Sequence, residues 1–195
     1  MYMRRVFLFA CSALSLIFAE PACAAPKMLA PESVRELLES HLSLAGAEGD
    51  MLDPTARATL ERRLGKEAGE LLATEGYFSP QVELRDSAEG LIVQVTPGPQ
   101  AHINSVAIEI RGALADERRK KLIAEWGLPI AAPFRQAAWD GAKNGLLRDL
   151  MAVDYSTARL LSSQAEVDVA TSQVDLSLVY DAGPRYRYGE IRILG

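Results

Sequence analysis

Two stretches of the chain repeat one pattern of alternating apolar and polar residues. The first runs from Leu91 to Gly112 and the second from Leu176 to Gly195, and in each a Gly-Pro pair separates two alternating segments. Alternation with a period of two predicts half-buried β-strands. The copies are 83 to 85 residues apart, a spacing that indicates a repeated small domain rather than a solenoid unit.

The residues between the copies predict two helices and a further strand. Asp116 caps a helix that ends near Trp126, and a second helix after Pro133 has an apolar stripe at spacings of three and four. The stripe consists of Trp139, Ala142, Leu146 and Leu150.

The polar turn 170–173 then joins two strands as a hairpin. On the first of them, one face is expected to hold Leu161, Ser163, Ala165, Val167 and Val169, and the other Ser162, Gln164, Glu166 and Asp168. The predicted order of elements is β-α-α-β-β.

The earlier part of the chain predicts the same order with a weaker beginning. A helix starts at Pro31, and Asp53-Pro54 starts a second one that ends at Gly76. Strands follow around Val82 and from Leu91, but only residues 27–30 precede the first helix. The fold class is therefore predicted to be α+β, with tandem modules of three mixed strands covered on one face by two helices. The first strand of the first module is expected to be degenerate.

The amino terminus has the pattern of a secretory signal. Two arginines precede the apolar run 6–18, and small residues follow it. Cleavage is expected after Ala24, with Ala22, Ala24 and Ala25 at the cleavage site. An uncleaved anchor helix is the alternative reading. Both cysteines, Cys11 and Cys23, fall within this segment, so the mature chain would have no thiol chemistry.

Charge and composition give no sign of a nucleic-acid partner or of catalysis. The leader holds two basic residues and one acidic residue, so residues 25–195 carry 19 basic and 25 acidic residues, a net charge of −6 without a basic stripe. The two histidines, His41 and His102, have no second ligand at metal-binding spacing, and no catalytic motif occurs. We expect no catalytic residue, no metal and no cofactor, and a chain that is not an enzyme.

Several phrases of the sequence resemble polypeptide-transport-associated (POTRA) domains. These are ATEGYFSP around Gly76, VTPGP at 95–99 and YDAGPRY at 180–186. PESVRELLESHLSL near the start and WGLP at 126–129 are most similar to outer-membrane assembly proteins of the TamA kind. The resemblance implies a third such domain and a membrane β-barrel after Gly195, so this chain would be a fragment or the product of a truncated gene.

The resemblance also implies location and partners. The full-length family lies at the periplasmic face of the outer membrane, and this chain alone is expected to be exported and soluble in the periplasm. The partners implied are unfolded outer-membrane or autotransporter polypeptides and a periplasm-spanning inner-membrane protein. Predicted segments are 1–24 (signal), 25–99 and 100–182 (modules), and 183–195 (a linker and the first strand of a third module).

The working surface is predicted to be the edge strand of the second module. An exposed edge has unpaired N–H and C=O groups to which an extended client can add as a further strand. Two alternatives stay open: an ordinary edge protected by its polar residues, and a periplasmic ligand-binding or enzymatic domain whose site is not recognised. The residues assigned to this edge are Leu161, Ser162, Ser163, Gln164, Ala165, Glu166 and Val167.

Overall fold

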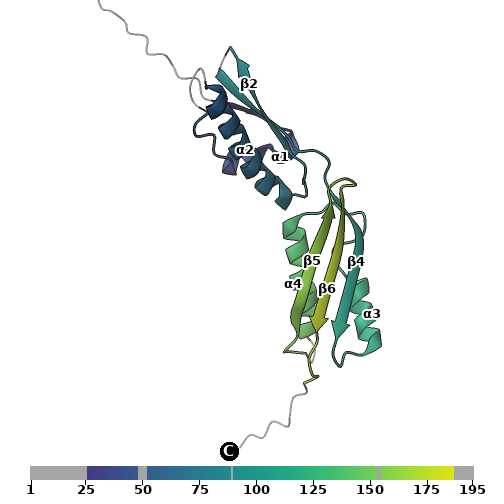
Figure 1. Cartoon of the computed structure of the whole chain (residues 1–195). Coiled ribbons are helices and arrows are strands. Elements are labelled where there is room, and N and C mark those ends of the chain that lie inside the picture. Colours follow the sequence, from purple (N-terminus) through teal and green to yellow (C-terminus); the bar gives the residue numbers. More distant parts are fainter. Residues whose placement is uncertain (1–25, 48–51, 89, 153–154, 187–195) are drawn as a thin grey trace, which may run out of the picture.

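The computed structural model describes residues 26–47, 52–88, 90–152 and 155–186, which form two sheets with their own helices (Figure 1). The α+β class predicted from the sequence is confirmed, and the element order is β-α-α-β-β twice. The elements are β1 (Lys27–Leu29), α1 (Glu32–His41), α2 (Pro54–Thr74), β2 (Gln81–Ser87), β3 (Gly90–Thr96), β4 (His102–Arg111), α3 (Asp116–Ala124), α4 (Gln136–Met151), β5 (Arg159–Asp168) and β6 (Gln173–Asp181).

Both sheets have the same mixed topology. The strand orders are β1-β3-β2 and β4-β6-β5, so the last strand of each sheet is central. It pairs in parallel with the first strand and antiparallel with its hairpin partner. The strand expected to be degenerate, β1, is three residues long and pairs with Ile92–Gln94 of β3.

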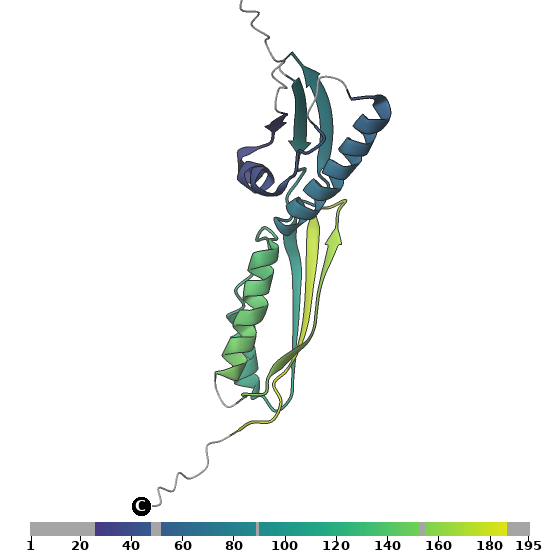
Figure 2. The ribbon, with the colours of Figure 1, turned by 90° about the vertical axis from the view of Figure 1, so that its left-hand side faces the viewer.

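Helices cover one face of each sheet, and Figure 2 shows α4 on one side of the β4-β6-β5 sheet with the opposite side bare. The central strands supply every second residue to the cores because adjacent side chains of a strand point to opposite faces. Two buried clusters result. The central strands contribute Leu91, Val93 and Val95 of β3, and Val174, Leu176, Leu178 and Tyr180 of β6.

The two parts meet where α2 ends. Gly76 adopts a left-handed φ of +86°, a conformation in which glycine commonly ends helices. Its carbonyl accepts the N–H of Ala101 (2.8 Å), and the Ala101 carbonyl accepts the N–H of Phe134 (2.8 Å). Tyr77 packs against the first core and Phe78 against the second. The segment after α2 therefore joins the two cores directly.

None of the described helices has the length and apolar character needed to cross a bilayer. The expected cleavage site at Ala22, Ala24 and Ala25 lies outside the described residues, as do residues 187–195 of the predicted linker and strand 183–195.

Candidate functional site

β5 forms one edge of the second sheet. It pairs antiparallel with β6 from Arg159 to Asp168, and Figure 1 shows it on the side of β6 away from β4. The residues predicted for a partner-binding edge, from Leu161 to Val167, all lie on this strand. Within the described ranges, no side chain forms a hydrogen bond with the β5 backbone.

The helix-facing side of β5 is partly apolar. Leu160 lies opposite Tyr180, whose OH donates to the Lys143 carbonyl of α4 (3.0 Å). Ala165 and Val167 lie opposite Leu176 and Val174. The β6 residues are fully buried, whereas the β5 residues are only half-buried, as expected where a sheet ends and no further strand covers it.

A β-bulge corrects the predicted faces of this strand. The register shifts between Leu160 and Ser162, so Leu160 and Ser163 occupy the helix-facing side. Leu161, predicted to share that face with Ser163, is 44% exposed. The extra residue of a bulge changes the phase of the alternation. The faces predicted from the sequence assume strict alternation along the whole strand, so Leu161 is assigned to the wrong face.

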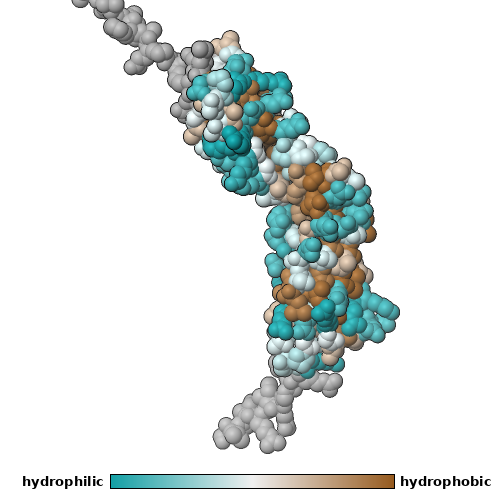
Figure 3. All heavy atoms as spheres, in the orientation of Figure 1, coloured by the Kyte–Doolittle hydropathy of each residue, from teal (hydrophilic) through white to brown (hydrophobic). Residues whose placement is uncertain are grey.

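The outer face of β5 is polar and solvent-exposed. Ser162, Gln164, Glu166 and Asp168 lie there as predicted, opposite Val179, Ser177, Asp175 and Gln173. Figure 3 looks onto this face of the sheet and shows hydrophilic and hydrophobic residues mixed over it. The edge thus has one half-buried apolar side and one polar side.

The hairpin turn fixes the end of this edge. The carboxylate of Asp168 accepts the N–H groups of Ala170 (2.9 Å) and Thr171 (3.4 Å). Hydrogen bonds from the Thr171 side chain and from these two backbone groups lower the pKa of Asp168, so the carboxylate that orders the turn stays ionised.

The opposite edge of the same sheet, β4, is occupied at both of its ends. The segment before α4 pairs with the start of β4, through Ala131 N–H to the Ile103 carbonyl (2.8 Å) and Ile103 N–H to the Ala132 carbonyl (2.9 Å). At the other end, the Arg119 guanidinium donates to the Ile110 carbonyl (3.2 Å). These groups occupy positions that an added strand would need.

In the first sheet, a side chain from a helix binds part of the longer edge, β2. Arg57 of α2 donates to the Leu84 carbonyl of β2 and forms an ion pair with Asp86 (2.8 Å). The edge at β1 is only three residues long. Of the edges that the structure describes, β5 combines the full length of a strand with an uncovered backbone.

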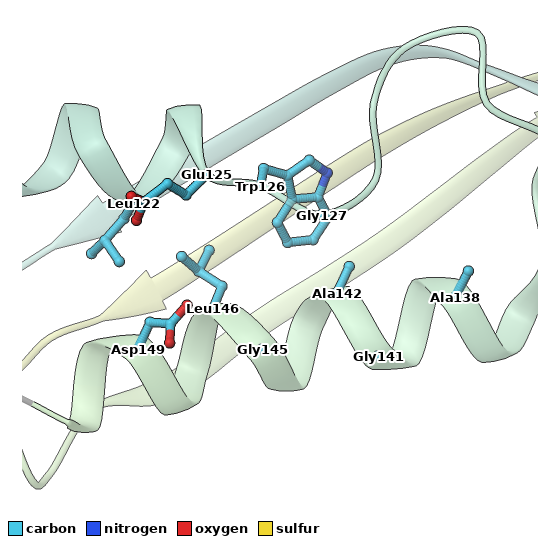
Figure 4. A pocket seen from close by; sticks show the side chains of 10 residues that line it. All are labelled: Leu122, Glu125, Trp126, Gly127, Ala138, Gly141, Ala142, Gly145, Leu146 and Asp149. Carbon is cyan, nitrogen blue, oxygen red and sulfur yellow. The ribbon is translucent and has the colours of Figure 1, made fainter.

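A groove of about 360 Å³ lies between α3 and α4. Figure 4 shows Trp126 above α4 near Ala142, with Ala138 toward one end of the groove and Glu125 and Asp149 toward the other. Trp126 stacks edge-on against Trp139, with ring centroids 6.2 Å apart, and Trp139 belongs to the core. Trp139 therefore serves packing, as its helical spacing indicated, and Trp126 packs against the same core from the segment after α3.

The histidines do not come together. His41 ends α1, where its Nδ1 is 3.0 Å from the Leu37 carbonyl, and His102 begins β4. Within the described ranges, no group of three or more His, Cys, Asp and Glu residues could hold a metal ion.

No family model matches the chain. Distant structural similarity is found to BamA POTRA3-5 of Haemophilus influenzae, with 20% identity, 84% of this chain and 66% of that chain covered, and a TM-score of 0.43. The amino-terminal domain of Omp85 from Thermosynechococcus elongatus gives 14% identity, coverages of 80% and 61%, and a TM-score of 0.41. POTRA1-3 of Omp85 from Anabaena is 10% identical, with 78% of this chain and 58% of that chain covered and a TM-score of 0.42. The chain spans less than two thirds of each of these proteins.

Proposed function

We propose that this chain is a periplasmic interaction module, not an enzyme, that accepts extended polypeptide segments as an additional strand along β5. The observation that carries the proposal is the uncovered backbone of β5, in contrast to the edges at β4 and β2, which other groups partly occupy. Hydrogen bonds to this backbone depend little on the client's sequence, which suits a protein that handles many clients.

The two faces of β5 favour a client in which apolar and polar residues alternate. Every second side chain of an added strand would face α4 and extend the half-buried apolar strip of Leu160, Ala165 and Val167. The residues between them would face water beside Ser162 and Gln164. Alternation of this kind is the pattern of strands in outer-membrane barrels.

The resemblance of the sequence to TamA-like proteins supports a more specific role. In this role the chain serves outer-membrane protein assembly on the periplasmic side. Its clients would be unfolded outer-membrane or autotransporter polypeptides, and its partner a periplasm-spanning inner-membrane protein. Export through the leader, with cleavage after Ala24, belongs to the same proposal.

Proline substitutions in β5 test strand addition. The N–H groups of consecutive strand residues point to opposite sides, so of Ser163→Pro and Gln164→Pro one removes an outward N–H and the other a bond to β6. Amide exchange in the parent distinguishes them, because the N–H bonded to β6 exchanges slowly. The outward proline should leave the circular-dichroism spectrum and melting temperature nearly unchanged but weaken the binding of extended peptides.

The inward proline serves as the control for damage to the sheet, since it should lower the melting temperature. If the outward variant folds normally and binds extended peptides as well as the parent does, strand addition at β5 is wrong.

A further inference from the structure

We infer that the β5 edge selects extended segments with basic residues on their outer face, at the positions beside Glu166 and Asp168. This inference rests on the proposed strand addition and names the chemistry of the segment that it favours. The carboxylates of Glu166, Asp168 and Asp175 are exposed and form no binding site by themselves. They acquire a role because they border an edge whose backbone is uncovered.

The outer face beside the edge holds like charges in direct opposition. Glu166 of β5 lies opposite Asp175 of β6, and Asp168 is the next residue on the same face. All three side chains are exposed. Like charges directly opposite each other across a strand pair are destabilising, so this end of the hairpin has an electrostatic cost that a cation would relieve.

In the described part of the chain, Asp168 and Asp175 accept hydrogen bonds from neutral groups only. Asp175 accepts hydrogen bonds from Asn104 Nδ2 (2.9 Å) and Ser105 Oγ, both near the start of β4. Among the described residues, no Lys, Arg or His forms an ion pair with Glu166, Asp168 or Asp175. At the opposite end of the same strand pair, Arg159 is paired with Asp181 (3.2 Å).

Asp175 and Asp168 stay ionised at neutral pH despite their proximity. Hydrogen bonds from Ser105 and then Asn104 lower the pKa of Asp175, although the negative charge of Asp168 acts in the opposite direction. The pKa of Asp168 is lowered by the hydrogen bonds of the turn. Repulsion between the two acids is therefore present at neutral pH, and protonation does not remove it.

A strand added to β5 puts its side chains within reach of this row. Residues opposite each other on neighbouring strands have Cβ atoms roughly 4.5–5.5 Å apart on the same face. A lysine or arginine opposite Glu166 would therefore lie beside a carboxylate that has no other cation. The neutral residues Ser162 and Gln164 occupy the same face nearer the bulge, so charge selection is confined to the hairpin end and also fixes the register of the client.

Three synthetic peptides of about nine residues, a typical strand length, test this inference. They alternate valine with lysine, glutamine or glutamate, carry a fluorophore, and are used below the concentration at which they scatter light. The lysine peptide should bind the full-length exported protein about threefold to tenfold more tightly than the glutamine peptide, and the glutamate peptide should bind most weakly. The difference in affinity among the three peptides should shrink in about 1 M salt, because the Debye length is then roughly 3 Å and charges farther apart are screened.

Variants of Glu166 give the decisive comparison. Glu166→Gln should reduce the preference for lysine, and Glu166→Lys should shift it toward the glutamate peptide, with unchanged circular dichroism. Glu39→Lys, at an exposed acid on α1, is the matched control for net charge and should leave the preference unchanged. Equal binding of the three peptides to the parent, or the same shift in Glu39→Lys as in Glu166→Lys, would overturn the inference.

Failure of this inference is distinguishable from failure of strand addition. If the outward β5 proline weakens all three peptides equally and no charge preference exists, strand addition stands and charge selection is wrong. If a lysine preference persists while the proline has no effect, the basic peptides bind elsewhere on an acidic surface, and both ideas are wrong.

Discussion

Gly76→Ala is expected to damage the junction between the two cores. Gly76 follows the end of α2 with φ at +86°, and a Cβ at this position would lie 2.2 Å from the Phe134 carbonyl oxygen and 3.2 Å from its carbon. The obstacle is backbone that cannot turn away as a flexible side chain would. Phe134 is also tied in place through its N–H to the Ala101 carbonyl.

The magnitude follows from two costs. A left-handed conformation costs a non-glycine residue roughly 1–2 kcal/mol, and a shift of packed backbone costs roughly 1–3 kcal/mol more. The free energy of unfolding should therefore fall by about 2–5 kcal/mol. For domains of this size each 1 kcal/mol corresponds to about 4–8 °C in melting temperature, so we expect a decrease of about 8 °C or more.

The assay combines denaturant unfolding, followed by circular dichroism, with the distance between spin labels on α2 and α4. If the strain is relieved by separation of the modules, the label distance changes or broadens even where stability is partly retained. Gly65→Ala is the control, because Gly65 lies within α2 and a Cβ there meets no atom within 4 Å. It should stabilise the protein by about 0.5–1 kcal/mol. A Gly76→Ala protein with parental stability and an unchanged label distance would refute this reasoning.

Three further predictions concern the core, a helix cap and export. Burial raises the pKa of Tyr180 to about 12, so the folded state favours the neutral phenol. The contribution of Tyr180 to the free energy of unfolding is therefore complete below about pH 10 and is lost as the pH rises toward 12. Tyr180→Phe should weaken that alkaline loss in a pH series of denaturant titrations, and a loss identical to the parent's would contradict it. Asp53→Ala should cost about 1 kcal/mol in the same titrations, because the Asp53 carboxylate accepts the N–H groups of Thr55 (2.8 Å) and Ala56 (2.9 Å) at the start of α2; no change would argue against the cap. Amino-terminal sequencing of exported protein should begin at Ala25, and a start at Met1 would contradict cleavage.

Local signals in the sequence were sufficient for the order of elements. Asp53-Pro54 predicts the start of α2, and the carboxylate of Asp53 does cap it. The alternation of Leu176, Leu178 and Tyr180 predicts a strand with one buried face, and all three are buried. These features depend on neighbours in the chain, and for this reason spacing alone reveals them.

Features that depend on distant contacts were beyond the sequence pattern. The bulge after Leu160 alters which leucine packs inward, and Leu161 is exposed in consequence. The approach of Phe134 to Gly76 joins residues from different modules, and no local signal marks it. The difference between the β4 and β5 edges likewise arises from Arg119 and from the segment before α4, which pair with β4 only after folding.

Amide hydrogen exchange of the exported protein, with and without the lysine peptide, tests the central claim most directly. Strand addition predicts that the outward N–H groups of β5 between Ser162 and Asp168, every second one, become protected when the peptide binds, while the N–H groups bonded to β6 stay as slow as before. Binding that protects α3 and α4, or leaves every β5 amide unchanged, would contradict the assignment of β5 as the working edge.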